Sequence, residues 1–431
     1  MFTSGLGRRR TVGAERSHRC RDGHGGEYWG PDRAVAAAPG MTQEQLAEAS
    51  GVSVATIRKL ERNDRESARM GTLRQLAQAL GVKTTDLMQT GPIEAPLAPE
   101  VDPAGILAIR RVITPTRGLG RVAHADDVHD APTITGVRAS VREGNRLYQG
   151  DDYAATLGAL PSVLTEAAQV AELAKGEARL AALEVQAQAY QLAGSTLIHL
   201  RHDDLAYQAL NRAIDLAERS GNQVLGASAV VSLCWLLLRQ RRFDEAEDVA
   251  VATADAIEPS FRHSTASHLG TWGWLLLRGS AAAVRNNRTP EADEMIRQAK
   301  AAAVLVGRDV IDYHEYWTTF GPNTVAMKEV ENAMVLREYG KALQLSGQVT
   351  APARSTSNNR NRHLLDLAAA HTEQRDHAPA TEILMSIKRA APEWLRYQRY
   401  ARDIATTLVT RRKRGLPPQL VELADFLAVE L

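Results

Sequence analysis

The chain has 431 residues, with 52 Lys or Arg against 51 Asp or Glu, so its formal net charge is only +1. This balance excludes a bulk basic field, so any affinity for nucleic acid must come from a local patch of cations. Two distant cysteines and the lack of a long apolar run argue against a disulfide scaffold and a membrane span, and they predict a cytoplasmic protein. Abundant Ala and Leu with few aromatic residues predict packed helices.

The first forty residues (1–40) are rich in Gly and Arg and show no apolar period, which predicts a disordered tail. His18, Cys20 and His24 lie close together in this tail. Their spacing fits no zinc motif and a fourth ligand is missing, so we expect no metal site there.

Residues 41–90 predict a small domain of short helices. Thr42 can cap the first helix, with Gln45 three residues later completing a capping box. Gly51 predicts a tight turn, and Ser53 is the next N-cap candidate. Two helices joined by so short a turn are typical of a helix-turn-helix unit.

Three segments of this stretch carry a family resemblance: TQEQLAEASGVS, ATIRKLER and LRQLAQALGV. They resemble the XRE (Cro/C1-type) helix-turn-helix family of bacterial transcriptional regulators. In that family the second helix of the pair lies in the major groove of DNA. The resemblance implies contacts with base edges from Val54, Ala55, Arg58 and Lys59, and with phosphates from Gln43, Ser53, Thr56 and Arg62. It also implies that the partner is double-stranded operator DNA, bound by a homodimer on a palindromic site.

The resembled family has another helix just before the position of Met41, and this chain has YWGPDRAVAAAPG there. If the codons are read one nucleotide later, the segment can spell the missing helix, so a frameshift is one interpretation. The other is a genuine divergent N-terminus or a start at Met41. Without that helix, buried residues such as Leu46 and Ile57 would lose part of their cover.

A Pro-rich stretch follows, with Pro92, Pro96, Pro99 and Pro103 spaced along 91–105. Such spacing favours an extended linker, and we place the domain boundary there. Residues 106–431 are expected to form the second domain.

From about residue 151 onward the sequence predicts recurring helix pairs. A small residue occupies the same place in each of five units: Ala206, Ala246, Ala292, Ala342 and Ala380. The units are about 40 to 50 residues apart, longer than the tetratricopeptide period of about 34. The layout nevertheless resembles tetratricopeptide repeats, and the expected fold is therefore all-α, with a helix-turn-helix domain joined to an α-solenoid.

The inner face of a solenoid is its usual binding surface. The sequence offers Trp274, Tyr313, Trp317 and Asn323 as candidates to hold a peptide or protein ligand there. The alternative is that the aromatic residues pack between repeats, which the helical spacing of Tyr313, Trp317 and Phe320 favours.

The chain carries no phosphate loop, no GxSxG elbow and no HExxH motif, so we expect no enzyme activity, metal or cofactor. The predicted function is a sequence-specific DNA-binding transcriptional regulator, modulated by a ligand of the repeat domain. The alternative is a protein- or peptide-binding repeat scaffold with an impaired DNA-binding domain.

Overall fold

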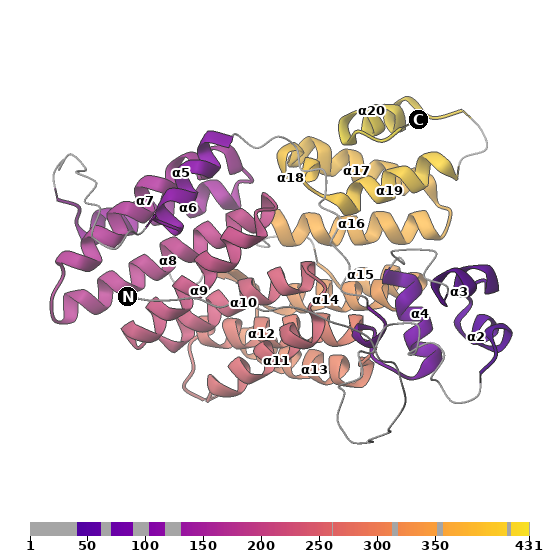
Figure 1. The fold of residues 1–431 in the computed structure, drawn as a ribbon, viewed down its shortest axis with the longest axis horizontal. Coiled ribbons are helices and arrows are strands. Elements are labelled where there is room, and N and C mark those ends of the chain that lie inside the picture. The colour runs from indigo at the N-terminus through magenta and orange to yellow at the C-terminus, as the bar shows by residue number, and fades with distance from the viewer. Residues whose placement is uncertain are drawn as a thin grey trace, which may run out of the picture.

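The computed structural model describes residues 41–61, 70–88, 103–116, 131–260, 262–312, 318–350, 357–411 and 415–430. A small helical domain at the N-terminal end is followed by a long array of helix pairs (Figure 1), which confirms the predicted fold class. The expectations for residues 1–40, including the frameshift, lie outside the described residues. None of the described helices is long and apolar enough to cross a lipid bilayer.

The small domain contains helices α2 (Gln43–Ser50), α3 (Val54–Glu61) and α4 (Met70–Leu80) and the short 3-10 helix η1 (Thr85–Leu87). The predicted capping box is present, since the Thr42 hydroxyl accepts from the Gln45 backbone N–H at 3.2 Å and the Thr42 N–H donates to Gln45 Oε1 at 2.8 Å. Gly51 ends α2 in the left-handed region, with φ of 66°. The buried core of the small domain is made of Leu46, Val52, Ile57, Leu76, Ala77 and Leu87.

The repeat array is built from six consecutive helix pairs within the described residues. They are α6 (Ile134–Gln149) with α7 (Tyr153–Leu173), α8 (Glu177–His199) with α9 (Asp203–Ser220), α10 (Gln223–Arg239) with α11 (Phe243–Ala256), α12 (Ala266–Arg285) with α13 (Thr289–Val306), α14 (Pro322–Val335) with α15 (Tyr339–Ser346), and α16 (Ser357–Glu373) with α17 (His377–Ala390). Helix α5 (Pro103–Ile113) precedes them, and α18 (Pro392–Arg396), α19 (Arg399–Thr410) and α20 (Pro418–Leu427) follow. Helix α5 thus begins within the stretch predicted to be linker.

Two short strands interrupt the helices between α13 and α14. Strand β1 (Val310–Asp312) pairs antiparallel with β2 (Thr318–Phe320), so that Val310 lies opposite Phe320. The sequence did not predict this ribbon, which is too short to show an alternating pattern.

The repeating unit is defined by one turn and one buried small residue. The five predicted alanines are each the fourth residue of the second helix of a pair, and all are 0% exposed: Ala206, Ala246, Ala292, Ala342 and Ala380. Two residues before each of these helices, the chain adopts a left-handed φ of 61–66°: at Arg201, Arg241, Asn287, Arg337 and Arg375. Asp151 has the same φ before α7, where Thr156 takes the place of the alanine. The alanine pattern missed this pair for that reason.

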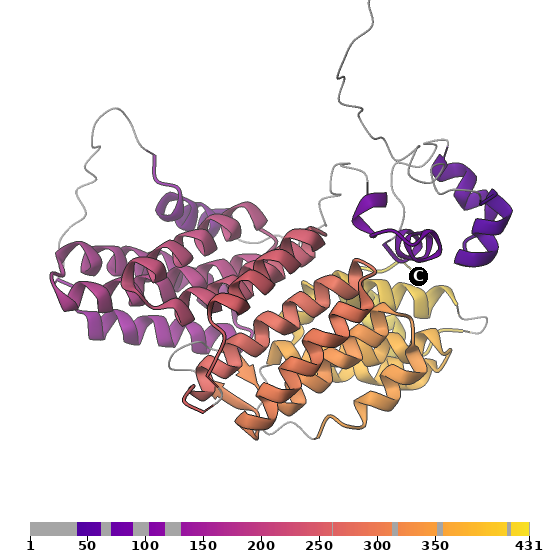
Figure 2. The same ribbon diagram turned by 90° about the horizontal axis from the view of Figure 1, so that it is seen from below.

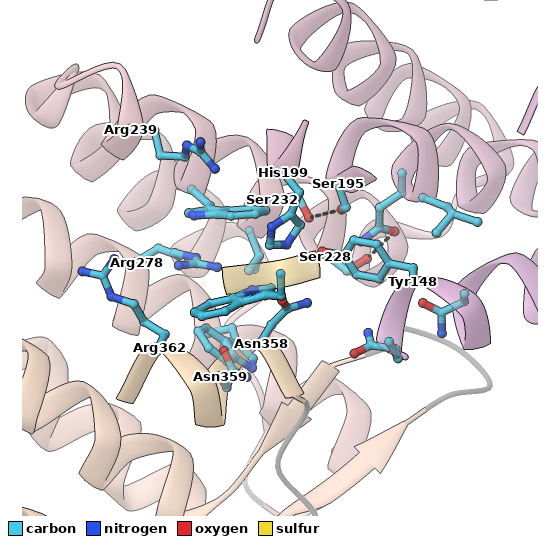
Figure 3. Close-up of a pocket in the computed structure, with 18 of the residues that line it drawn as sticks. Tyr148, Ser195, His199, Ser228, Ser232, Arg239, Arg278, Asn358, Asn359 and Arg362 are labelled. Atoms are coloured by element: carbon cyan, nitrogen blue, oxygen red, sulfur yellow. Dashed lines mark hydrogen bonds between the residues drawn. The ribbon is translucent and has the colours of Figure 1, made fainter. Parts of the chain in front are cut away.

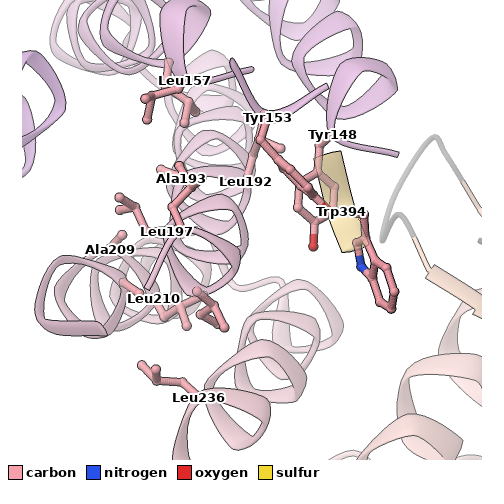
Figure 4. Packing of buried hydrophobic residues seen from close by; sticks show 14 of the residues in the cluster. Tyr148, Tyr153, Leu157, Leu192, Ala193, Leu197, Ala209, Leu210, Leu236 and Trp394 are labelled. Atoms are coloured by element: carbon pink, nitrogen blue, oxygen red, sulfur yellow. The ribbon is translucent and has the colours of Figure 1, made fainter. Parts of the chain in front are cut away.

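The small residues let neighbouring helices approach closely. Figure 4 shows Ala193 and Leu197 of α8 facing Ala209 and Leu210 of α9, and all four are 0% exposed. Each pair packs against the next in the same way, which produces the curved solenoid expected of such repeats.

Helix α12 passes close to the ribbon at Gly273. A Cβ atom added there would lie 2.1 Å from Cζ of Phe320, whose ring is 2% exposed. We therefore expect Gly273→Ala to lower the free energy of unfolding by about 1–3 kcal/mol, since the ring has to shift within a filled core. Urea unfolding followed by tryptophan fluorescence measures this.

The matched control is Gly158→Ala in α7, where an added Cβ meets no atom within 4 Å. Removing a helical glycine at an open position should raise the free energy of unfolding by up to about 1 kcal/mol. Equal responses of the two variants would contradict the close packing at Gly273.

Candidate functional site

Helix α3 presents an exposed face to solvent. Ala55, Arg58 and Lys59 are exposed, whereas Val54 and Thr56 are half-buried. The hydroxyl of Ser53 is used within the domain, because it accepts from the Thr56 backbone N–H at 3.2 Å. The two hydroxyls of Ser53 and Thr56 also lie 2.9 Å apart. The exposed side chains of this face are therefore Ser53, Ala55, Arg58 and Lys59, of which Ser53 is engaged in a local hydrogen bond.

Arg58 is oriented by α2. Its Nε donates to Gln43 Oε1 at 2.9 Å, and Nη2 forms an ion pair with Glu44 at 3.2 Å. Such exposed pairs contribute at most about 1 kcal/mol, so a nucleic acid can displace Glu44. Arg62, the remaining residue implied by the resemblance, lies outside the described residues.

The small domain docks on the repeat array through α4 and η1 and leaves α2 and α3 at the outer edge (Figures 1 and 2). Arg74 of α4 is the central contact and is 8% exposed. Its Nε donates to the carbonyl of Val284 at 3.2 Å, and Nη1 donates to the carbonyl of Val335 at 2.7 Å. These carbonyls close the last turns of α12 and α14, where the helix dipole favours a cation.

Two further contacts surround Arg74. The backbone N–H and hydroxyl of Thr85 donate to Asn286 Oδ1 at 3.1 and 3.0 Å. The ammonium of Lys83 lies 2.8 Å from Asp244 Oδ1. Burial lowers the pKa of Arg74, and the nearby Arg337 and Arg285 lower it further. The carbonyl dipoles supply the hydrogen bonds that hold the charged guanidinium in this buried position.

A cavity of about 300 Å³ lies inside the curve of the repeats. The first helices of successive pairs line it, and α16, α18 and α19 close it. Its described lining contains no Asp or Glu but has six cations: Arg201, Arg239, Arg278, Lys328, Arg362 and Arg399. It also contains six ring-bearing residues: Tyr148, His199, Trp235, Trp274, Trp394 and Tyr400. Figure 3 shows three of the arginines gathered on one side, with Tyr148 and the serines opposite.

The lining residues recur at helical spacing. Helix α10 contributes Ser228, Ser232, Trp235 and Arg239, one face of that helix. The hydroxyl of Ser228 donates to Gln191 Oε1 of α8 at 3.1 Å. Burial holds the pKa of His199, also on α8, well below its ordinary value. The imidazole is therefore neutral at pH 7.

A cluster of charged groups adjoins the cavity. Glu331 lies 2.7 Å from the Lys328 ammonium and 2.5 Å from Arg285, and Asp366 lies 3.7 Å from Arg362. Burial alone would raise the pKa of Glu331, but Lys328, Arg285 and Arg362 outweigh it and hold that pKa well below its ordinary value. Lys328 and Arg362 therefore have carboxylate partners.

The ligand residues predicted from the sequence fall in three places. Trp274 lies in the wall of the cavity, and its indole N–H donates to the carbonyl of Thr319 at 2.9 Å. Asn323 does not line the cavity, and its Oδ1 accepts from the Thr350 N–H and hydroxyl, both at 3.0 Å. Tyr313 and Trp317 lie outside the described residues.

Sequence reasoning missed the arginines of the cavity. Arg239 ends the apolar helix α10 and Arg278 lies within α12, and a single basic residue in such a helix is usually assigned to the surface. These arginines share one helix face with the serines and tryptophans of α10 and α12. That pattern would have identified them only if the sequence had also shown which face of each helix points inward.

These features define a helix-turn-helix domain with an open second helix, fused to a helical repeat solenoid that encloses a pocket. Residues 33–87 match the helix-turn-helix family, which confirms the domain expected from the XRE-like segments. The match begins eight residues before Met41.

Two solved structures are similar to the repeat array. One is PilF of Pseudomonas aeruginosa, with 15% identity, a TM-score of 0.33, and coverage of 62% of this chain and 98% of that chain. The other is a Rap protein complexed with competence and sporulation factor, with 10% identity, a TM-score of 0.41, and coverage of 69% and 87%. Among curated proteins, none matches the chain.

Proposed function

We propose that the protein is a sequence-specific DNA-binding transcriptional regulator whose activity is set by a ligand in the cavity of the repeats. The observation that carries the proposal is the α3 face of Ala55, Arg58 and Lys59, which stays exposed while the other side of the domain is docked. In helix-turn-helix proteins the second helix reads base edges in the major groove. We propose that a homodimer presents two such helices to a palindromic operator.

The regulatory step proposed here uses the docking contact. Helix α12 carries Trp274 and Arg278 into the cavity and ends beside Val284, whose carbonyl Arg74 binds. A second connection runs from Lys328 in the cavity through Glu331 to Arg285. A ligand that shifts α12 or α14 would therefore shift the small domain, and two such positions would differ in the spacing of the two α3 helices of a dimer.

Selection of operators from a random duplex library tests DNA binding. Once a site is selected, we expect Arg58→Ala and Lys59→Ala each to weaken binding by about 1–3 kcal/mol, chiefly through lost discrimination at single base pairs. Fluorescence anisotropy at two salt concentrations measures this loss. An equal loss on all sequences would identify the two residues as phosphate contacts.

The control variant is Lys175→Ala, an exposed lysine of the repeat domain far from α3 in the chain, which should leave the affinity unchanged. If no sequence is enriched and binding stays non-specific, the proposal fails. The protein would then be better described as an interaction scaffold, as tested by a pull-down that requires residues 151–431 but not 41–90.

A further inference from the structure

Arg239 and Arg278 of the cavity form no ion pair with a carboxylate among the described residues. The buried Nε and Nη2 atoms of Arg239 and the buried Nε atom of Arg278 have no hydrogen-bond acceptor there. The Nε atom of Arg362 also lacks an acceptor there, but Asp366 lies 3.7 Å from it, and Glu331 accompanies Lys328. Arg239 and Arg278 thus combine buried, unbonded guanidinium nitrogens with the lack of an ion pair among the described residues.

Aromatic rings hold these two guanidinium groups in place. Arg239 lies 5.5 Å from the centre of the Trp235 ring, and Arg278 lies 6.0 Å from the same ring and 5.0 Å from that of Trp274. Contacts of this kind use the face of a guanidinium and leave the N–H groups at its edge free to donate. The two forks are therefore positioned before any ligand arrives.

An unpaired buried cation lowers the stability of a folded protein, and a bound anion can compensate its charge. Burial lowers the pKa of Arg239 to about 9 and also lowers that of Arg278, and the weaker opposing effects of Asp203 and Glu331 do not offset it. Arginine forks match the two oxygens of a carboxylate or a phosphate.

The remaining lining limits the size and character of the ligand. The cavity of about 300 Å³ is at the lower end of the range of ligand pockets, which favours a small molecule over a peptide. Besides the arginines it offers the Tyr148 ring and the amides of Asn358 and Asn359. These suit a flat or apolar body with a few polar groups.

We propose that this cavity binds a small organic oxyanion, a carboxylate or a phosphate ester attached to a flat or apolar group, with Arg239 and Arg278 donating to the oxygens. This proposal names the class of ligand that the cavity binds. Only the role of that ligand in regulating DNA binding rests on the proposed function. Binding itself does not require DNA, so the two proposals can fail separately.

The test uses the full chain with three probes of similar size, in a buffer free of phosphate and sulfate. They are phenyl phosphate, benzoate and benzamide, the last being the uncharged counterpart of benzoate. Calorimetry and quenching of tryptophan fluorescence measure the dissociation constants. We expect at least one anion to bind at least 10-fold more tightly than benzamide, and the tighter of the two identifies the phosphate or the carboxylate class. Equal affinities for all three probes would overturn the proposal.

Arg239→Met and Arg278→Met separate ligand binding from a structural role. Methionine keeps the apolar stem and removes the unpaired charge, so each variant should lose at least 10-fold in anion affinity. Its thermal midpoint without ligand should equal or exceed that of the wild type, because no partner is left unsatisfied. Arg219→Met, at an exposed arginine of α9, should change neither quantity. Undiminished anion affinity in both cavity variants would overturn the proposal.

Discussion

Replacing Glu331 with glutamine is expected to lower the free energy of unfolding of the repeat domain by about 3–5 kcal/mol, the range for breaking a buried ion pair from one side. Glu331 is 8% exposed and lies within 2.7 Å of both Lys328 and Arg285. Its removal leaves these two cations and Arg362 in a confined space with Asp366 as the remaining described carboxylate. Urea unfolding followed by tryptophan fluorescence measures the loss.

The pH dependence of this effect has a definite sign. The pKa of Glu331 in the folded protein is held well below the value of about 4.3 for an unfolded chain. Its stabilising contribution is therefore fully present above pH ~4.3 and is lost as the pH falls through the folded pKa. The difference between the wild type and Glu331→Gln should accordingly be constant near neutrality and shrink in acid.

Glu294→Gln provides the control, because the pair of Glu294 with Arg297 on α13 is exposed. This variant should leave the unfolding midpoint unchanged, as exposed pairs contribute little. A similar midpoint for both glutamine variants would show that the Glu331 cluster is solvated and does not hold α12 and α14 together.

Features set by local chemistry could be predicted from the sequence. The capping box at Thr42 and the turn at Gly51 each depend on residues within one helical turn, and both are present. The five anchoring alanines were also identifiable, because close helix approach selects a small side chain at one position of each unit. Thr156 shows the limit of that rule, since a threonine fills the same place and conceals the unit built on α6 and α7.

Features that depend on distant parts of the chain could not be predicted. The cavity draws on helices from α6 to α19, and its arginines become a group only when the superhelix closes. The docking of Arg74 leaves no sequence trace at all, because its acceptors are backbone carbonyls at Val284 and Val335. Any residue with a carbonyl at a helix end would serve, so no side-chain pattern marks the partner.

Replacing Arg74 with methionine should release the helix-turn-helix domain from the repeats. The two hydrogen bonds to helix-end carbonyls are charge-assisted, and the loss of such a bond costs about 1.5–3 kcal/mol. Since both bonds are lost, the ratio of docked to free domains should fall by at least roughly 10-fold. Methionine preserves the apolar stem, so the cores of both domains should remain folded.

Distances between spin labels measure this release. Labels at Ala55 on α3 and Leu173 on α7 sit at exposed positions, in a background where Cys20 and Cys234 are replaced by alanine. The wild type should give one narrow distance distribution and Arg74→Met a broad one. The control is Lys83→Met, which removes only the exposed pair with Asp244 and should keep the narrow distribution.

The same variant connects the docking contact to DNA recognition. If docking fixes the separation of the two α3 helices in a dimer, the wild type should bind operators of one half-site spacing and reject others. Arg74→Met should tolerate several spacings and bind the preferred one more weakly, because a free domain must be ordered on binding. A variant that keeps both the narrow label distribution and the strict spacing would show that Arg74 does not control the position of the domain. A shift of α12 caused by a ligand in the cavity would then not change the position of the small domain.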